Sequence, residues 1–506
     1  MEKVCVLGAG STKYGKLEDS ISDITLQASV DAIENAGIEP KEIQAGYISN
    51  VFGVADKQVH LGPVVMSNLG ISECPSLSIE SACGSGSVSF REAFANVAAG
   101  FYDAVLVTGT EKVTHTGTDW TTTYFSYCSD FFYEGQAGAS FPGLFASMAR
   151  AYLHEFDATE EDLASVAVKN HENGFLNPKA HFRKKITIDD VMNSPVVASP
   201  LKLYDCCPFS DGASSVILCS EKFAKEHSKD YVKVIGSGRG GSSAALQGRE
   251  HLTTIPSTKI AAEAAFKMAG ITSKNIDFAE VHDCFTVAEV VDTEDLGFFE
   301  KGTGATAARN GETKLNGSIS INPSGGLKSK GHPIGATGVG QIVEVFEQLT
   351  GQSGERTVND AKIGLTQNFG LLAQVVQFIS FKVCKLSAKP EFIEAAKAGN
   401  VLARKCTKCD ELHLATIYFC KKCGSKEFED SILKGAGKVV TYTIMTVPPA
   451  GFEDLAPYAW VVMELGDYDL RISGFLANIQ KPEDLPIGAA VKVVDFDDRG
   501  IVLEKI

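Results

Sequence analysis

An internal repeat constrains the fold of this chain more than any other feature of its sequence. The segment Asn35–Ile43 (NAGIEPKEI) is similar to the segment Met268–Ile276 (MAGITSKNI). Each segment follows apolar residues at helical spacing and precedes an apolar run that is typical of a strand. A repeated element inside alternating helix and strand patterns predicts that residues 1–384 form two copies of one α/β unit.

A single cysteine follows a strand pattern in the first copy. The residues around Cys83 read SIESACGSGS (78–87). Apolar residues then recur at helical spacing, at Phe90, Phe94, Val97 and Phe101. We therefore expect Cys83 on a tight strand-to-helix turn, with its sulfur at a helix N-terminus where unpaired N–H groups favour a thiolate. This makes Cys83 a candidate nucleophile, and a small buried core residue is the alternative.

The second copy carries His332 where the first copy carries Cys83, in a glycine-rich turn that reads GHPIGATGVG (331–340). Two further side chains, His282 and Cys284, follow a strand of the second copy. A neutral histidine beside a cysteine can serve as its base, and a second thiol can serve as a general acid or base. We expect these four residues to form one site, whereas hydrogen-bonded structural histidines are the alternative.

Four cysteines near the C-terminus are spaced as metal ligands. Two Cys-x-x-Cys pairs, separated by ten residues, comprise Cys406, Cys409, Cys420 and Cys423. Such pairs supply four thiolates tetrahedrally to one Zn²⁺ ion, and because no position remains for water, a structural role is expected. Rubredoxin-like iron fits the same spacing, and a disulfide pair is the remaining alternative.

The sequence patterns divide the chain into successive segments. The expected segments are an N-terminal half over 1–235 with an insertion at about 115–200, a C-terminal half over 236–384, a linker over 385–400, a zinc ribbon over 401–428 and a small β-barrel over 429–506. The barrel is expected because short strands alternate with turns there.

Charge and composition bear on partners and compartment. The net charge of −16 argues against general binding to nucleic acids or anionic membranes, and no apolar run is long enough to span a bilayer. Thirteen cysteines in a sequence without a recognisable export signal indicate the reducing cytoplasm.

Taken together, the motifs resemble those of the thiolase family. The motifs are SACGSG (81–86), SDGA (210–213), HDCF (282–285), NPSGG (322–326) and GHP (331–333). HDCF in place of NEAF resembles the sterol-carrier-protein type of thiolase. The resemblance implies a duplicated α/β fold with five layers (αβαβα). The last part of the chain resembles the zinc-ribbon plus OB-fold family that accompanies thiolase-like proteins, usually as a separate chain.

The resemblance also implies roles for single residues. Cys83 would take the acyl group, His332 would activate it, and Cys284 would be the second acid/base cysteine. His282 and His332 would line the oxyanion site for the substrate thioester, and the N–H groups of Gly370 and Cys83 would form the other oxyanion hole.

Other implied contacts concern substrate and cofactor. Thiolases usually carry the second cysteine in a Cys-x-Gly motif, and here that place reads Asn368-Phe-Gly370, which leaves Cys284 as the candidate. Asn322 and Gly326 are expected at the oxyanion and substrate site. Coenzyme A is the implied substrate, and its phosphates need cations. The candidates for them are Arg183, Lys184 and Lys185, with a solvated surface run as the alternative.

The implied activity is that of an acyltransferase, an acetyl-CoA C-acyltransferase or thiolase. It would cleave or form a 3-oxoacyl-CoA reversibly through an acyl-Cys83 intermediate. The family implies a homodimer or a dimer of dimers, and a partner enzyme of acyl-CoA metabolism. A retro-aldolase acting on an acyl-CoA side chain and a non-catalytic acyl-CoA-binding scaffold are the alternatives. The OB fold shows no basic, aromatic face, so no nucleic acid is expected.

Overall fold

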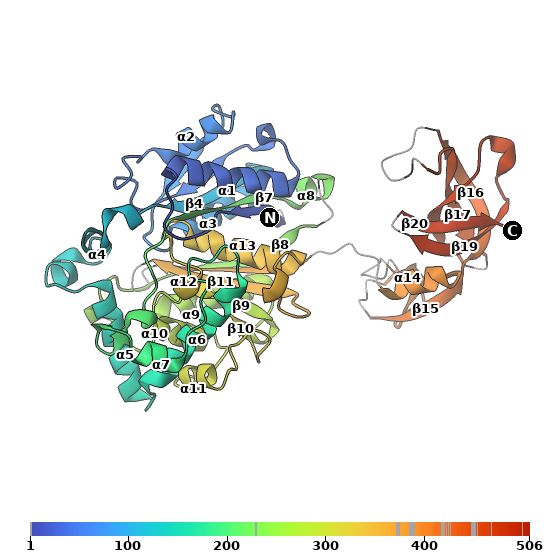
Figure 1. The fold of residues 1–506 in the computed structure, drawn as a ribbon. Coiled ribbons are helices and arrows are strands. Elements are labelled where there is room, and N and C mark those ends of the chain that lie inside the picture. Colours follow the sequence, from blue (N-terminus) through green and yellow to red (C-terminus); the bar gives the residue numbers. More distant parts are fainter. Residues whose placement is uncertain are drawn as a thin grey trace. The chain divides into compact units, whose positions relative to one another are not determined.

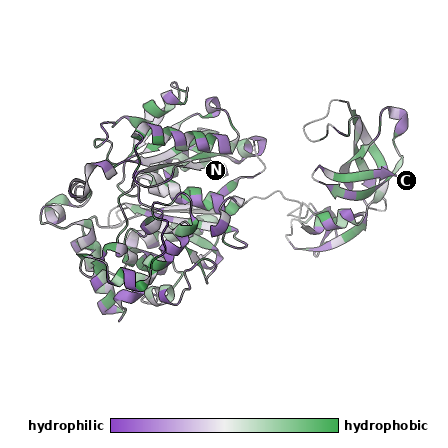
Figure 2. Cartoon of the chain, in the orientation of Figure 1, coloured by the Kyte–Doolittle hydropathy of each residue, from purple (hydrophilic) through white to green (hydrophobic). Residues whose placement is uncertain are grey.

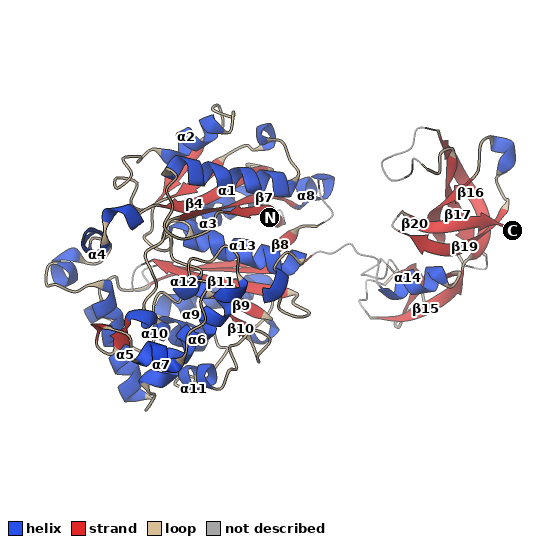
Figure 3. Ribbon diagram, in the orientation of Figure 1, coloured by secondary structure: helices blue, strands red, loops and turns tan. Residues whose placement is uncertain are grey.

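The structure is a computed structural model. It describes residues 3–227, 230–370, 375–383, 390–415, 420, 422–423, 425, 427–446, 452, 454–466, 468–497 and 499–506. The chain divides into two compact units, Met1–Lys385 and Leu386–Ile506. Figure 3 shows that the first unit combines helices with strands, whereas strands dominate the second.

Ten strands in the first unit form one hydrogen-bonded series. In chain order they are β1 (Val4–Ser11), β2 (Gly46–Ser49), β3 (Ser76–Ile79), β4 (Ala104–Glu111), β7 (Gly212–Ser220), β8 (Val232–Gly241), β9 (Phe278–Glu280), β10 (Ser320–Ile321), β11 (Ile363–Gly370) and β12 (Val375–Val383). Their spatial order is β10-β9-β11-β12-β8-β1-β7-β4-β2-β3. The expected boundary at residue 235 falls within β8.

The strand order is that of one five-stranded unit repeated. From β1 outward, the pairings with β7, β4, β2 and β3 are antiparallel, antiparallel, parallel and parallel. From β8 outward, the pairings with β12, β11, β9 and β10 follow the same sequence. The two halves meet where β1 and β8 pair antiparallel. The duplication predicted from the sequence repeat is therefore confirmed.

The repeated segments have the same local structure in both halves. Helix α1 (Ile21–Ala36) ends at Gly37, and helix α9 (Pro256–Ala269) ends at Gly270. The two glycines adopt φ values of 68° and 69°, in the left-handed region that residues with a Cβ adopt at a cost. A short 3₁₀ turn follows each glycine and leads toward the next strand, β2 or β9.

Helices and strands of the first unit form five layers (Figure 1). Helix α1 packs on β1 and β7, and helix α9 packs on β8 and β12. Helices α3 (Ser85–Ala98) and α13 (Thr337–Thr350) lie between the two halves and contact each other. Helix α1 carries hydrophilic and hydrophobic residues along its length, as a helix with one buried face requires (Figure 2). The expected αβαβα fold is confirmed.

The central helices pack closely because glycines lie at their contact. A Cβ on Gly86 would come within 2.9 Å of the backbone nitrogen of Val339, and a Cβ on Gly338 would come within 2.4 Å of the backbone nitrogen of Ser87. Side chains at these two positions would push the helix N-termini apart. The apolar face predicted for α3 is buried at Phe90, Phe94 and Val97. Phe101 is an exception: the helix ends at Ala98, and Phe101 is 73% exposed.

The segment between β4 and β7 contains the residues predicted to form the insertion, about 115–200. Its helices are α4 (Thr118–Ser126), α5 (Phe141–Glu155), α6 (Glu160–Leu176) and α7 (Ile188–Met192), and two short strands follow, β5 (Val196–Ala198) and β6 (Leu201–Lys202). Helices α5 and α6 pack against α10 (Thr286–Asp295) of the second half. The insertion of the first half therefore covers the second half. The other helices of this unit are α2 (Leu61–Asn68), α8 (Glu221–His227), α11 (Gly304–Arg309) and α12 (Gly326–Ser329).

The second unit contains a small sheet and a barrel. The sheet has the order β14-β13-β15, with β13 at Asn400–Cys406, β14 at Leu412–Leu414 and β15 at Phe428–Lys434. The closed barrel comprises β16 (Ala436–Met445), β17 (Tyr458–Leu465), β18 (Arg471–Ala477), β19 (Ala490–Asp497) and β20 (Gly500–Lys505). Part of the expected linker forms helix α14 (Pro390–Lys397), which packs on β13 and β19, while residues 385–389 lie outside the described residues. In the described part of the chain, no helix is long and apolar enough to cross a membrane.

Candidate active site

The nucleophile candidate Cys83 lies on a strained turn between β3 and α3. The residue before it, Ala82, has a φ of 48°, a left-handed conformation that alanine rarely adopts. The hydroxyl of Ser85, the first residue of α3, donates to the carbonyl oxygen of Ala82 (2.6 Å) and accepts from the N–H of Ser81 (2.7 Å). These two bonds hold the turn, and the cysteine is buried at the start of the helix, as the sequence predicts.

The turn that carries His332 is held from both sides. Its backbone N–H donates to the hydroxyl of Ser210 (3.2 Å). The hydroxyl of Thr337 donates to the carbonyl oxygen of Pro333 (3.0 Å) and lies 2.7 Å from Nδ1 of His332. Because the threonine proton is already engaged, its oxygen accepts from Nδ1–H of the imidazole. The neutral ring of His332 therefore keeps a lone pair on Nε2.

His282 follows strand β9 and has the opposite tautomer. Its backbone N–H donates to the side-chain oxygen of Gln367 (2.9 Å), and its Nδ1 accepts from the amide Nδ2 of Asn368 (2.7 Å). A neutral ring that accepts at Nδ1 carries its proton on Nε2. This Nε2 is fully buried and has no hydrogen-bond partner among the described residues. This N–H group is therefore a donor without an acceptor among the described residues, and a substrate oxygen that enters the site can accept from it.

The structure brings three of the predicted catalytic residues together. Cys83, His282 and His332 each offer one atom, and these atoms all lie within 4.8 Å of one another. The two imidazole rings meet edge to face with centroids 5.0 Å apart. Burial, reinforced by His332, lowers the pKa of His282 well below its usual value, and burial together with Lys328 lowers the pKa of His332 to about 3. Both rings are therefore neutral at pH 7.

These groups face an apolar cavity of about 90 Å³. Its wall consists of six phenylalanines, four cysteines, the two histidines, a threonine and a proline: Phe125, Phe141, Phe145, Phe209, Phe285, Phe369, Cys83, Cys206, Cys207, Cys284, His282, His332, Thr122 and Pro142. Helices α4 and α5 of the insertion supply part of the wall, including Phe125 from α4 and Phe141 and Phe145 from α5. An apolar wall around a few converging polar groups is the usual character of a small-molecule site.

Cys284 lines the same cavity as Cys83. Burial, with the nearby thiols of Cys207 and Cys83, raises the pKa of Cys284 well above its usual value. The carbonyl oxygen of Cys284 accepts from the N–H of Cys207 (2.9 Å). Cys284 is therefore a protonated thiol at neutral pH, which suits a proton donor rather than a resting nucleophile.

Gly370 lies directly against the nucleophile turn. A Cβ on Gly370 would come within 2.1 Å of the carbonyl oxygen of Ser81, and a Cβ on Gly84 would come within 2.9 Å of the backbone nitrogen of Gly370. The end of β11 can approach the turn this closely only because both positions are glycine. The backbone N–H of Gly370 is thereby brought to the loop that carries Cys83.

Asn322 and Gly326, by contrast, do not line the cavity. The amide of Asn322 accepts from the N–H of Val281 (2.8 Å) and donates to Glu289 (2.8 Å). A Cβ on Gly326 would come within 2.4 Å of a carboxylate oxygen of Asp283. These contacts support the HDCF loop from behind, so the two residues position the site without facing it.

The basic run is exposed. Arg183 donates to the carbonyl oxygen of Phe175 (3.2 Å), and the ammonium group of Lys185 lies 5.1 Å from the centre of the Phe175 ring. Lys184 lines a second cavity of about 330 Å³, whose wall shares Cys206 and Cys207 with the first cavity. The run therefore lies near the active site without a contact to the catalytic side chains.

Sequence reasoning missed the residues that fix the two imidazoles. Thr337 lies five positions after His332 in the chain, and a hydroxyl at the start of a helix was a visible signal. Asn368 was noticed only as the absence of a cysteine. Its contact with His282 joins residues that are 86 positions apart, and no local pattern indicates such a bond.

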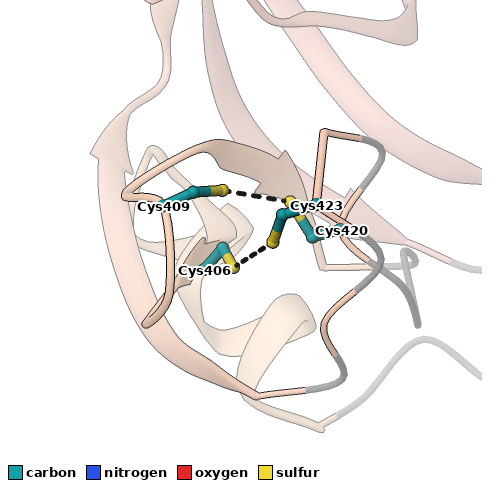
Figure 4. A group of neighbouring side chains, drawn as sticks. All are labelled: Cys406, Cys409, Cys420 and Cys423. Atoms are coloured by element: carbon teal, nitrogen blue, oxygen red, sulfur yellow. Dashed lines mark hydrogen bonds between the residues drawn. The ribbon is translucent and has the colours of Figure 1, made fainter.

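The four C-terminal cysteines form a cluster within the second unit (Figure 4). The sulfur atoms of Cys406 and Cys423 lie 3.6 Å apart, and those of Cys409 and Cys420 lie 3.4 Å apart. Zn–S bonds of about 2.3 Å in a tetrahedron put sulfurs roughly 3.8 Å apart, so this arrangement fits one metal ion. Nε2 of His413 lies 3.3 Å from the sulfur of Cys420 and can donate to a metal-bound thiolate.

Comparison with protein-family models assigns both units. The thiolase N-terminal domain matches residues 4–222, and the thiolase C-terminal domain-like model matches residues 238–379. The rubredoxin-like zinc ribbon domain of ChsH2 matches residues 394–429, and its C-terminal OB-fold domain matches residues 432–497. The expected resemblance to both families is confirmed.

Curated relatives and solved structures agree with this assignment. An acetyl-CoA acetyltransferase of Methanothermobacter thermautotrophicus is 44% identical over 73% of this chain and 97% of the relative. The benzoylsuccinyl-CoA thiolase subunit BbsB of Thauera aromatica is 34% identical over 69% and 90%. The sterol carrier protein 2 of Gallus gallus is 32% identical over 74% and 71%.

Two solved structures share the fold. The structure titled Ltp2-ChsH2(DUF35) aldolase is 24% identical with a TM-score of 0.64, over 75% of this chain and 97% of that one. Human mitochondrial 3-ketoacyl-CoA thiolase is 17% identical with a TM-score of 0.59, over 75% and 98%. The chain therefore belongs to the thiolase family and is an acyltransferase that carries a ChsH2-type zinc ribbon and OB-fold domain.

Proposed function

We propose that the protein is a thiolase that reversibly cleaves a 3-oxoacyl-CoA with coenzyme A, or forms one by Claisen condensation, through an acyl-Cys83 intermediate. The observation that supports this most is the cluster of Cys83, His282 and His332 in an apolar cavity that Cys284 also lines. The 44% identical relative named acetyl-CoA acetyltransferase supports the same reaction class. The phenylalanines of the wall favour an apolar acyl group.

The first step is attack by Cys83 on the 3-keto carbon. Nε2 of His332 carries a lone pair and takes the thiol proton, since Nδ1–H donates to Thr337. The thiolate then adds to the carbonyl carbon, and the resulting oxyanion accepts from the N–H groups of Cys83 and Gly370. Collapse of this intermediate breaks the carbon–carbon bond and leaves the acyl group on Cys83.

The leaving group is the enolate of acetyl-CoA. Its thioester oxygen accepts from Nε2–H of His282, a buried donor without a partner among the described residues, and from the proton now on Nε2 of His332. Cys284 is a protonated thiol because burial raises its pKa, and it gives its proton to the enolate carbon. Acetyl-CoA then leaves, and Cys284 remains as a thiolate.

Coenzyme A completes the turnover. Its thiol gives a proton to the Cys284 thiolate and attacks the acyl-Cys83 thioester, and Cys83 leaves as a thiolate that recovers its proton from His332. All protons are thereby returned. We assign the phosphates of coenzyme A to the exposed cations Arg183, Lys184 and Lys185, since Lys184 lines a cavity that adjoins the active site.

The remaining assignments concern metal, assembly and compartment. We propose that the four-cysteine cluster binds a structural Zn²⁺ ion, because its sulfur spacing fits a closed tetrahedral site. We further propose a cytoplasmic homodimer or dimer of dimers that passes acyl-CoA intermediates to a partner enzyme, without a role in nucleic-acid or membrane binding.

A retro-aldolase is the second candidate. It is favoured by the shared fold with a structure titled as an aldolase and by the ChsH2-type domains of the second unit. An aldol cleavage does not need an acyl-accepting cysteine, so the complete set of Cys83, His282, His332 and Cys284 argues for the thiolase. A non-catalytic acyl-CoA scaffold would not need the set either.

A steady-state assay separates these functions. The thiolase account predicts CoA-dependent loss of acetoacetyl-CoA or of a longer or aromatic 3-oxoacyl-CoA, abolished in Cys83→Ser and strongly reduced in His332→Asn. CoA-independent release of a carbonyl compound from a 3-hydroxyacyl-CoA, unaffected by Cys83→Ser, would assign the aldolase. Binding of acyl-CoA without either reaction would assign the scaffold.

A further inference from the structure

The catalytic cluster has the donor set of a zinc site. Cys83, His282 and His332 offer one sulfur and two ring nitrogens, and all three atoms lie within 4.8 Å of one another. Zn–S bonds of about 2.3 Å and Zn–N bonds of about 2.0–2.1 Å place tetrahedral ligands roughly 3.3–3.6 Å apart, which is within that limit. We propose that these residues bind a second Zn²⁺ ion, which inhibits the enzyme and is independent of the four-cysteine cluster.

The free nitrogen of each ring is known from its other contact. Nδ1 of His332 is engaged with Thr337, and Nδ1 of His282 is engaged with Asn368, so each ring presents Nε2. Nε2 of His282 is fully buried and has no hydrogen-bond partner among the described residues. A buried polar atom without a partner is costly, and once the ring proton moves to Nδ1, the lone pair left on Nε2 can bind a metal ion there.

The cavity leaves room for the fourth ligand. A water molecule needs roughly 10–15 Å³ of such space, and the cavity beside the cluster measures about 90 Å³. Three protein ligands and one open position are the pattern of an accessible zinc site, whereas the four-cysteine cluster is closed. A metal ion at this position would also occupy the place of the substrate carbonyl.

Metal binding requires the ring proton of His282 to move, and the hydrogen bond from Asn368 resists this change. Binding releases the thiol proton of Cys83 to solvent and moves the proton of His282 from Nε2 to Nδ1. Nδ1–H then faces the donor Nδ2 of Asn368, so the amide must turn to present its oxygen. That oxygen has no hydrogen-bond partner among the described residues, so turning breaks only the bond to His282.

Asn368→Asp therefore gives a test with two opposite effects. A carboxylate accepts from Nδ1–H and completes a carboxylate–histidine–zinc arrangement, for which a change of such a partner typically alters metal affinity about 10–100-fold. The same carboxylate removes Nε2–H of the neutral ring as a donor to the substrate oxygen. The variant is expected to bind Zn²⁺ more tightly and to turn over more slowly.

The experiment uses the full chain with one zinc ion already bound. Zn²⁺ or Co²⁺ is added without substrate, and metal per chain is measured by native mass spectrometry, with the thiolate-to-cobalt absorption band as a second readout. We expect a second equivalent in the wild type, its loss in Cys83→Ala and His282→Ala, and tighter binding in Asn368→Asp. Cys74→Ser, which removes a thiol that donates to the carbonyl oxygen of Ile43 and does not line the cavity, is the matched control and keeps the second equivalent.

Two results would overturn the proposal. One is a wild type that never takes up a second equivalent. The other is a second equivalent that remains in both alanine variants, which would place it elsewhere on the protein. A gain in zinc affinity in Asn368→Asp cannot arise from misfolding. This measurement therefore tests the proposal even if an alanine variant is unstable. Because metal binding is measured without substrate turnover, the binding result can be interpreted even if the thiolase assignment is wrong.

Discussion

The amide nitrogen of Asn368 lies 2.7 Å from Nδ1 of His282, and this one hydrogen bond decides which ring nitrogen carries the proton. The amide is a donor, so the proton lies on Nε2, which faces Cys83 and His332. Asn368 occupies the place where thiolases usually carry a cysteine. In the proposed mechanism, Asn368 therefore orients the oxyanion donor His282 and does not itself move protons.

Replacing Asn368 with leucine removes that control. With Nδ1 unpaired, the ring loses its fixed tautomer and orientation, and kcat/KM is expected to fall by up to about 10²–10³-fold, the usual cost of an oxyanion donor. The measurement is steady-state cleavage of the best 3-oxoacyl-CoA, together with ¹⁵N NMR of the histidine tautomer. Asn359→Leu, an exposed substitution, is the control, and an unchanged tautomer in Asn368→Leu would contradict the account.

Cys284→Ser separates acyl transfer from carbon–carbon chemistry. A serine hydroxyl is a far weaker acid than a thiol, so the enolate is no longer protonated, although Cys83 keeps its base. The variant is expected to exchange an acetyl group between acetyl-CoA and Cys83 while losing cleavage and condensation. Isotope exchange between CoA and acetyl-CoA measures the first reaction. Equal losses of both reactions would argue against the proposed role.

The pH dependence follows from the shifted groups. Burial lowers the pKa of His332 to about 3, so its ring stays neutral as the pH falls from 7 to 5, and burial also lowers the pKa of His282 and raises the pKa of the Cys284 thiol. All three shifts move titration away from the range around neutral pH, so we expect a flat kcat/KM profile there. A profile of kcat/KM with a limb near pH 6.5 that disappears in His332→Asn would contradict this assignment.

Stability should respond to acid through the same ring. An unfolded histidine takes up a proton near pH 6.5, whereas folded His332 does so only near pH 3. The unfolded state therefore binds more protons in this window, and the free energy of unfolding falls as the pH drops from about 6.5 toward 3. Urea unfolding at pH 7.5 and 5.5 should show a smaller loss in His332→Asn than in the wild type.

The zinc ribbon should depend on its metal, whereas the first unit should not. Metal binding contributes much of the folding free energy of such small sites, about 10–16 kcal/mol in zinc-finger peptides. A chelator, or Cys420→Ser, is expected to make residues 394–429 susceptible to protease while residues 4–379 stay resistant. Mass spectrometry of the fragments together with zinc analysis measures this. Cleavage of the first unit at the same rate would contradict independent stability.

Local patterns and the repeat allowed much of the fold to be predicted. The equivalent glycines Gly37 and Gly270, and the turns before α3 and α13, follow from residues that lie close together in the chain. The predicted apolar helix face wrongly included Phe101, because periodicity does not show where a helix ends. The packing of α5 and α6 on the second half depends on contacts between distant segments, which a single sequence does not encode as a pattern.

The same limit applies to the site. The motifs indicated Cys83, His282, Cys284 and His332 because each lies at a strand end or helix start. They also drew attention to Asn322 and Gly326, whose contacts lie behind the HDCF loop. Whether a motif residue faces the cavity or supports it depends on side-chain direction after folding. Side-chain direction separates the four residues that line the cavity from Asn322 and Gly326, which do not.

Intact-protein mass spectrometry tests the central claim most directly. The full chain is mixed with acetoacetyl-CoA or acetyl-CoA, then with longer and aromatic 3-oxoacyl-CoAs, beside Cys83→Ser. The account predicts a mass gain of one acyl group that maps to Cys83, is absent in the variant and is discharged by free CoA. Rapid CoA-dependent turnover without any acyl adduct, or an adduct that remains in Cys83→Ser, would contradict covalent catalysis through Cys83.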